Sequence, residues 1–239
     1  MNAQGRTGAY RGRGLHGAVV EELGCRIAAG ELAEGQTIEL PQLETELDVS
    51  RTVLREALRV LKEKGLIDAR QKRGTYVQPR ARWRLLDPDV IRWQFQGRED
   101  RQFLNDLAEV RTIIEPASAR LAALRRTEDD LAAMTRALAA MSVAARGDAD
   151  PVEADLAFHR ALLAATHNEL LVRMEVVLQA GLAARDRLVH GVVQDDDPTP
   201  AHAAVLDAIG DGDPDAAAAA TAALLAKSIS DLDRIRSDT

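Results

Sequence analysis

The chain has 239 residues, enough for one large domain or two small ones. Its 46% hydrophobic residues are ordinary for a globular protein, and no apolar run approaches the ~20 residues that a membrane helix needs. The single cysteine, Cys25, excludes an internal disulfide; it is predicted to be a buried thiol, which fits a reducing cytoplasm. Residues 1–14 are polar, lack the apolar centre of a signal peptide and are predicted to be a flexible arm.

The net charge of −7 is unevenly distributed along the chain. Residues 1–84 carry 15 Lys and Arg against 11 Asp and Glu, a net charge of +4, and the remaining residues carry a net charge of −11. Phosphate groups respond to the local field, so a basic first part joined to an acidic second part is compatible with DNA binding. Aromatic residues make up only 3% of the chain, which argues against binding of single strands by base stacking.

Helices are predicted at residues 15–29, 40–47 and 49–64. In the third of these, Ser50 is a suitable N-cap because its hydroxyl can accept from a free amide of the first turn. Apolar residues at i, i+4 and i+7 give this helix a buried stripe. The stripe consists of Leu54, Leu58 and Leu61.

Two arginines stand one turn apart at the exposed start of the third helix, Arg51 and Arg55. In a helix-turn-helix protein this end of the second helix of the motif enters the major groove. Arginine matches both guanine edges and phosphates. The pattern therefore predicts a DNA-recognition helix.

A β-hairpin is predicted directly after the recognition helix, which Gly65 ends. The strands are expected at 67–70 and 75–78, with the basic tip Gln71-Lys72-Arg73-Gly74 between them. Such a tip can reach the DNA backbone or the minor groove. Residues 15–79 are thus predicted to form a winged helix-turn-helix domain, followed by a basic linker at residues 80–86.

Residues 87–239 are predicted to be entirely helical. A short helix begins at Asp87-Pro88, because proline is favourable in a first turn. The fold class is therefore mainly α, with strands only in the wing and an all-α bundle as the second domain. The further helices are predicted at residues 101–124, 128–145, 151–166, 168–190, 200–209 and 214–235.

A carboxylate and an imidazole share one face of the helix predicted at residues 151–166. Asp155 and His159 are four residues apart, so both side chains project from the same side and can bind one divalent metal ion. A surface Asp–His pair has the same spacing, so the alternative of a purely structural pair stays open. Arg111 is four residues before Glu115; it is either a clamp for a ligand carboxylate or the partner of Glu115 in an ion pair.

The chain resembles a known regulator family along nearly its whole length. The run from Glu34-Gly35-Gln36-Thr37-Ile38 through VSRTVLREALRVLKEKGLI to RGTYV is similar to the N-terminal domain of the GntR superfamily of bacterial transcription regulators. The second half resembles the FCD-type sensing domain of the FadR subfamily. The segment WRLLDPDVIRW at 83–93 looks most like regulators of sugar-acid catabolism.

The resemblance implies three sets of site residues. Ser50, Arg51, Thr52, Arg55, Lys72, Arg73 and Gly74 are expected to contact DNA. Asp155, His159 and His202 match three metal ligands of the sensing domain and are expected to hold one Zn, Ni or Mn ion. A further histidine of the family falls at Leu224, which cannot bind metal, so the alternative of a metal-free site, in which His159 and His202 bind a polar effector directly, stays open. Arg111, His159 and His202 are expected to contact the effector.

The predicted function is a DNA-binding repressor of a bacterial catabolic operon, acting in the cytoplasm without a membrane partner. A homodimer is expected to bind a palindromic operator in double-stranded DNA and to be released by a small carboxylate such as a sugar acid. The chain is not expected to be an enzyme. Two alternatives stay open: a constitutive DNA-binding dimer without an effector, and a metal-dependent enzyme with a DNA-binding head.

Overall fold

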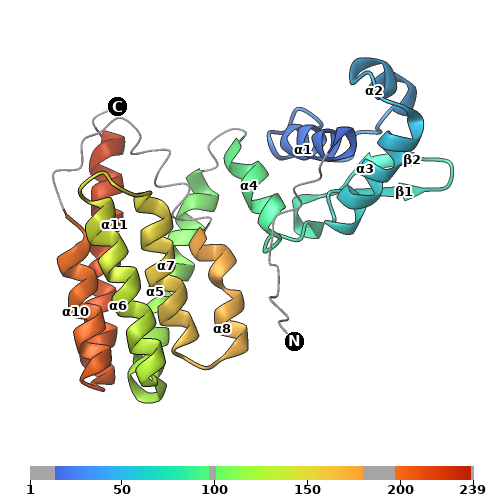
Figure 1. Ribbon diagram of the computed structural model, residues 1–239. Helices are drawn as coiled ribbons and strands as arrows, with labels where there is room; N and C mark the ends of the chain where they lie inside the picture. Colours follow the sequence, from blue (N-terminus) through green and yellow to red (C-terminus); the bar gives the residue numbers. More distant parts are fainter. Residues whose placement is uncertain (1–13, 97–100, 180–196, 238–239) are drawn as a thin grey trace, which may run out of the picture. The chain divides into compact units, whose positions relative to one another are not determined.

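The computed structural model describes residues 14–96, 101–179 and 197–237. The predicted arm at residues 1–14 lies almost wholly outside the described residues. The chain divides into two compact units, residues 1–100 and residues 101–239 (Figure 1).

The first unit is a winged helix-turn-helix domain, as the sequence predicts. Its helices are α1 (Leu15–Ala28), α2 (Leu40–Glu46) and α3 (Arg51–Glu63). Strands β1 (Ile67–Arg70) and β2 (Gly74–Val77) pair antiparallel, with Ile67 opposite Val77 and Arg70 opposite Gly74. Thr37 adds an isolated bridge to Tyr76, so the wing is joined to the segment before α2.

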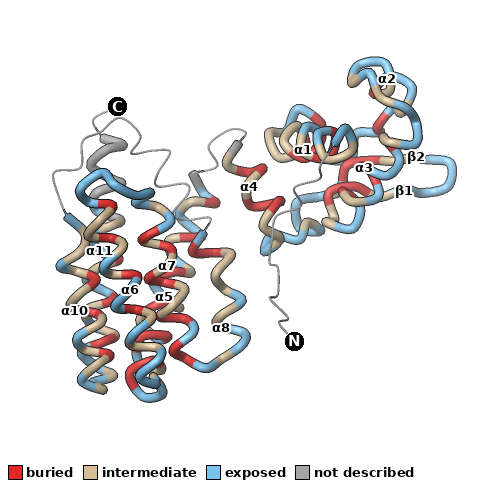
Figure 2. Tube along the Cα trace, in the orientation of Figure 1, coloured by how far each residue is buried: buried red, intermediate tan, exposed pale blue. Residues whose placement is uncertain are grey.

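The core of this unit is the apolar stripe of α3 packed on α1 (Figure 2). Leu23 of α1 and Leu54 and Leu61 of α3 have no exposed surface. Burying a leucine side chain stabilises the fold by about 1.5–3 kcal/mol. The same stripe leaves the charged side of α3 facing solvent, because helical periodicity separates the two faces.

Residues 80–96 pack onto the first unit, which differs from the predicted boundary at residue 87. A 3-10 turn at Arg80–Arg82 leads into α4 (Pro88–Gln96), which lies against α1. The ring of Trp93 is fully buried and occupies the space beside Gly24, where an added Cβ would lie 2.5 Å from the ring. Only glycine allows so close an approach. The sequence-based prediction assigned this helix to the second domain because it rested on the helical pattern alone, which does not indicate the unit against which the helix packs.

Charged side chains also fasten α4 to the first unit. The Lys64 ammonium lies 2.8 Å from both Asp87 and Asp89, and the Asp89 side chain is 2% exposed. Arg92 joins this group through Asp89 and through Glu21 of α1. A buried carboxylate requires such partners, because desolvation otherwise costs several kcal/mol.

The second unit is a bundle of helices, in agreement with the predicted all-α domain (Figure 1). Among the described residues no helix combines the length and apolar character that crossing a bilayer requires. The helix predicted at residues 168–190 is interrupted by a turn at Met174, and residues 180–190 lie outside the described residues. The helices are α5 (Arg101–Arg125), α6 (Glu128–Ala144), α7 (Pro151–Ala164), α8 (Glu169–Arg173), α10 (Thr199–Gly210) and α11 (Pro214–Ser237).

Local signals in the sequence define several helix starts. Thr127 and Asp130 form a capping box at α6, and the side chains of Asp150 and Asn168 cap α7 and α8. Two arginines at the end of α5 bind carbonyl groups at the C-terminal ends of other helices. Arg125 donates to Thr166 O after α7, and Arg126 donates to the last carbonyls of α10. These bonds satisfy carbonyls that the helices leave without partners.

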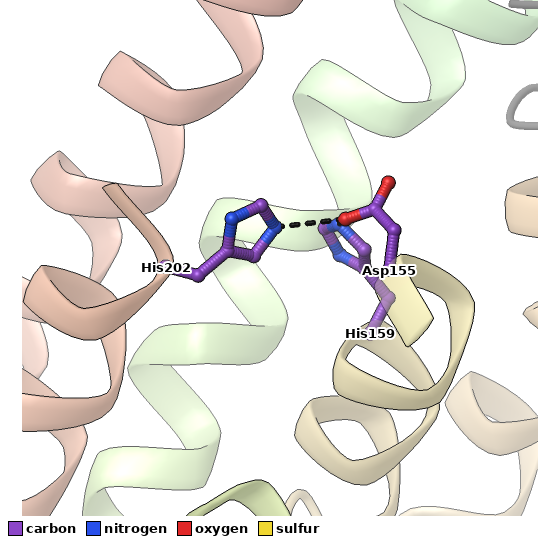
Figure 3. Close-up of side chains that lie close together, drawn as sticks. All are labelled: Asp155, His159 and His202. Carbon is purple, nitrogen blue, oxygen red and sulfur yellow. Dashed lines mark ion pairs between the residues drawn. The ribbon is translucent and has the colours of Figure 1, made fainter. Parts of the chain in front are cut away.

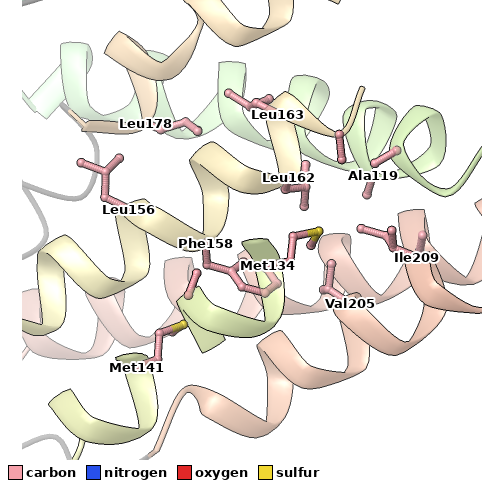
Figure 4. Packing of buried hydrophobic residues seen from close by; sticks show 14 of the residues in the cluster. Ala119, Met134, Met141, Leu156, Phe158, Leu162, Leu163, Leu178, Val205 and Ile209 are labelled. Atoms are coloured by element: carbon pink, nitrogen blue, oxygen red, sulfur yellow. The ribbon is translucent and has the colours of Figure 1, made fainter. Parts of the chain in front are cut away.

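The core of the bundle surrounds Phe158 of α7, which is fully buried (Figure 4). Met134 of α6 and Val205 and Ile209 of α10 contribute to the same cluster. The residue after Phe158 is His159, and the Phe158 ring meets the His202 ring edge-on with centroids 5.0 Å apart. The apolar core therefore borders directly on His159 and His202.

Candidate functional site

The predicted DNA-binding residues of α3 lie at its exposed start. Ser50 caps the helix, and its hydroxyl accepts from Val53 N at 3.4 Å. Thr52 and Arg55 are exposed, and the Arg51 side chain is 70% exposed, 3.7 Å from Glu44. No acidic side chain among the described residues pairs with Arg55. A free guanidinium at the start of this helix suits a base edge or a phosphate.

The wing tip holds its basic residues in two ways. Lys72 is exposed in the left-handed region with φ 71°, and Gly74 follows with φ 79°. The Arg73 guanidinium instead lies 3.8 Å from the centre of the Tyr76 ring and donates to Gly35 O at 3.2 Å. Arg73 therefore reinforces the hairpin, whereas Lys72 extends from its tip.

Three potential metal ligands meet between α7 and α10 (Figure 3). Asp155 and His159 project from one face of α7, as their spacing predicts, and His202 comes from the first turn of α10. Asp155 Oδ1 lies 2.9 Å from His202 Nε2 and 3.5 Å from His159 Nε2. One ligand atom from each residue lies within 4.8 Å of the other two, and both histidine side chains are only 3% exposed.

The other nitrogen of each histidine lies close to an oxygen. His202 Nδ1 lies 2.9 Å from Pro198 O, and because a carbonyl only accepts, Nδ1 carries the hydrogen. His159 Nδ1 lies 2.7 Å from Glu115 Oε2 in an ion-pair contact, although neither atom is directed along a hydrogen bond to the other. In the neutral form His202 then presents an Nε2 lone pair toward Asp155, the arrangement in which a histidine binds metal, and the Nε2 atom of His159 lies on the same side.

Several buried atoms of the cluster have no hydrogen-bond partner. Asp155 Oδ1 and His202 Nε2 are both in this state, although only 2.9 Å separates them. Neither atom is directed along the line that a hydrogen bond between them requires. Unsatisfied buried polar atoms are costly, and a cation placed between these ligands removes that cost. The donor set of two imidazoles and one carboxylate fits a divalent transition metal.

Burial and charge shift the pKa values of the group in opposite directions. Burial opposes the ionisation of Glu115, but His159 and Arg111 outweigh it, and the pKa of Glu115 falls to about 2. Burial also opposes the ionisation of Asp155, but His159 and His202 outweigh it, and the pKa of Asp155 falls well below its usual range. Burial also disfavours the charged form of His159, yet Glu115 and Asp155 raise its pKa to about 9. The carboxylates therefore attract positive charge, which either a proton or a metal ion supplies.

The structure places Arg111 next to this cluster. Its Nε lies 2.6 Å from Glu115 Oε1, so the ion pair considered from the sequence does form, and it is buried. The contact between Glu115 and His159 was not predicted, because it joins two helices and has no signal in the local pattern. Leu224 of α11 is half-buried and packs against the apolar core, as its side chain requires.

Comparison with known proteins assigns each unit to a family. Residues 15–77 match the bacterial regulatory proteins of the gntR family, and residues 106–227 match the FCD domain. The galactonate operon transcriptional repressor of Escherichia coli strain K12 is 35% identical over 214 residues, which are 88% of this chain and 93% of that protein. The transcriptional regulator LutR of Bacillus subtilis strain 168 is 38% identical over 147 residues, covering 61% of this chain and 65% of LutR.

Solved structures show the same fold. Lar, which controls the expression of the Listeria monocytogenes agr system, aligns with a TM-score of 0.65 at 18% identity, over 93% of this chain and 98% of Lar. The wing, the recognition helix and the helical bundle agree with both family assignments. The chain therefore belongs to the GntR family of bacterial regulatory proteins, with an FCD domain as its second unit, and it is a DNA-binding transcription regulator.

Proposed function

We propose that this regulator represses a catabolic operon and is released from its operator by a sugar acid. The observation that carries the proposal is the buried cluster of Asp155, His159 and His202, which lies in a different compact unit from the exposed arginines of α3. One unit thus presents basic groups for DNA, and the other encloses polar groups suited to a small ligand. The relative named as the galactonate operon repressor supports this class of effector.

In the proposed complex, α3 enters the major groove. Arg51 and Arg55 contact base edges or phosphates there, while Ser50 and Thr52 are placed to contact the backbone. The wing supports the complex through Lys72, with Gly74 allowing the backbone to turn and Arg73 shaping the tip. Two copies of the chain bind as a homodimer, so the operator is a palindrome whose half-sites match the two recognition helices.

In the second unit, Asp155, His159 and His202 hold one Zn, Ni or Mn ion. When bound, the ion supplies a positively charged attachment point for the carboxylate and hydroxyl oxygens of the effector. Three protein ligands leave coordination positions for such oxygens, more than a site with a histidine at Leu224 would leave. Arg111 is the second attachment point, because its guanidinium lies beside the cluster and is suited to a carboxylate.

The arrangement of the neighbouring groups supports sensing rather than catalysis. Glu115, the buried carboxylate beside the cluster, contacts Arg111 and His159, so it is not available as a general base. A sensor requires a ligand that binds two conformations of the protein with different affinities, and a carboxylate held in place, such as Glu115, can support that difference. Incubation of the protein with D-galactonate and its metal should therefore give no turnover.

The test measures operator binding by fluorescence anisotropy with a DNA fragment from upstream of the regulated genes. D-galactonate, D-gluconate and related acids are added with Ni²⁺ or Zn²⁺ and after chelation. We expect one acid to release the DNA, and release to require the metal. Failure of every acid to affect DNA binding or melting temperature would instead favour a constitutive DNA-binding dimer.

A further inference from the structure

Glu115 of α5 is the most enclosed carboxylate in the described part of the second unit, with an exposed fraction of 0%. It uses its two oxygens for different partners: Oε1 lies 2.6 Å from Arg111 Nε, and Oε2 lies 2.7 Å from His159 Nδ1. The first partner is on the same helix and the second is on α7. Glu115 thereby connects the residue proposed for the effector carboxylate with one proposed metal ligand.

The two histidines of the cluster are oriented by different kinds of group. His202 is held by a backbone carbonyl, Pro198 O, which no side-chain substitution removes. His159 is held at Nδ1 by a side-chain carboxylate. The direction of the His159 ring, and with it the position of its Nε2, therefore depends on Glu115 staying in place.

Arg111 in turn determines where Glu115 lies. The two residues are four apart on α5, so the helix places both on one face, and the buried Arg111 side chain holds Oε1. Without the guanidinium, the carboxylate loses the partner that fixes its rotamer. Arg111 thus reaches the metal ligand only through Glu115.

We propose that Glu115 is the positioning residue of the metal centre and that Arg111 acts on the centre through it. The inference rests on the proposed metal site. Glu115 does not bind the ion; its charged contact with Nδ1 holds the direction of the His159 ring so that Nε2 faces Asp155 and His202. Loss of such an orienting group typically weakens metal binding by about 10–100-fold.

The test compares metal binding by full-length variants. Ni²⁺ and Co²⁺ affinities are measured by calorimetry for the unchanged protein, for Glu115→Gln and for Glu115→Ala. The glutamine keeps an oxygen acceptor for His159 but removes the charge, so its dissociation constant should rise by about 10-fold, and that of the alanine variant by about 100-fold. Glu109→Gln, an exposed change on the same helix, is the matched control and should leave the affinity unchanged.

A spectrum separates positioning from general loss of structure. The visible absorption of bound Co²⁺ depends on the geometry of its ligands, so Glu115→Gln should alter the band while circular dichroism without metal stays as in the unchanged protein. An unaltered band and an unaltered affinity in both Glu115 variants would overturn the inference.

A double-mutant cycle tests the role of Arg111. Arg111→Met alone should weaken Ni²⁺ binding several-fold, and the double variant Arg111→Met with Glu115→Gln should bind no more weakly than Glu115→Gln alone. Additive losses would show that Arg111 acts independently of Glu115. If the unchanged protein binds neither ion, the proposed metal site and this inference both fail. If every variant binds the ions as tightly as the unchanged protein, only the inference about Glu115 fails and the metal site stands.

Discussion

The two units use the same residue types in opposite ways. In the first unit the Arg51 side chain is 70% exposed and Arg55 faces solvent, whereas in the second the Arg111 side chain is 10% exposed and is held by a fully buried glutamate. An exposed arginine keeps its hydration until DNA displaces the water, so it contributes little to folding. A buried arginine must be paired, so it contributes to the fold as well as to the site.

The comparison predicts that substitutions in the two units separate stability from DNA binding. Changes on the outer face of α3 should reduce operator affinity and leave the melting temperature unchanged. Changes around Glu115 should lower stability and alter the response to ligands, with DNA affinity preserved in the folded protein.

Arg111→Ala should have the largest effect on stability. It leaves Glu115 without its guanidinium partner in a buried setting, and breaking a buried ion pair in this way costs about 3–5 kcal/mol. Urea denaturation measures the loss. Arg120→Ala, on the exposed side of the same helix, is the control and should cost less than about 1 kcal/mol. The folded Arg111→Ala protein should still bind the operator but resist release by sugar acid; normal release would refute the proposed effector contact.

Asp155→Ala should abolish stabilisation by metal. A metal ion at a concentration of 100 times its dissociation constant stabilises the folded state by about 2.7 kcal/mol. Removing one of the three side chains that hold the ion should eliminate this gain. Thermal melting with and without Ni²⁺, and after chelation, measures it. The exposed Asp207→Ala of α10 should keep the full shift. An equal shift in both variants would place the ion elsewhere.

Arg55→Ala should weaken specific operator binding by about 1–3 kcal/mol, which is roughly 5–150-fold, because a base or phosphate contact is lost. Anisotropy titration against specific and unrelated DNA measures the change. Arg59→Ala is the matched control, since Arg59 lies one turn further along α3 and approaches Glu56 and Glu63. Equal losses in the two variants would mean that the start of α3 has no special role.

Lys72→Ala should have the smallest effect. An exposed lysine at the wing tip is suited to a phosphate, so its loss should weaken binding evenly across DNA sequences. The slope of log affinity against log salt should fall by about 1. Lys227→Ala in the second unit should leave that slope as it is. A change in sequence preference in Lys72→Ala would indicate a base contact instead.

Much of the fold was predictable because its signals are local. The Ser50 cap, the leucine stripe of α3 and the Thr127 capping box each act within one or two turns. The placement of α4 was not predictable, because it depends on Trp93 fitting beside Gly24, a contact between distant parts of the sequence. The break at Met174 likewise lacks a proline or glycine to mark it.

The candidate site shows the same division. The spacing of Asp155 and His159 is sufficient to predict that both side chains project from one face of α7, and the family resemblance adds His202 to the predicted site. The role proposed for Glu115 depends on its contact with His159, which arises only when α5 and α7 pack together. Side chains that orient other side chains rarely have a sequence pattern of their own, because the contact crosses between elements.

Trp83 and Trp93 are the only tryptophans of the chain, and both belong to the first unit. Trp93 is buried between α4 and α1, and Trp83 donates from its indole nitrogen to Gln78 O at the base of the wing. The intrinsic fluorescence of the protein is therefore a built-in optical probe of the DNA-binding unit alone. A change of emission when a sugar acid is added to the unlabelled protein, without any DNA present, would show that the acid alters the surroundings of the tryptophans in the DNA-binding unit.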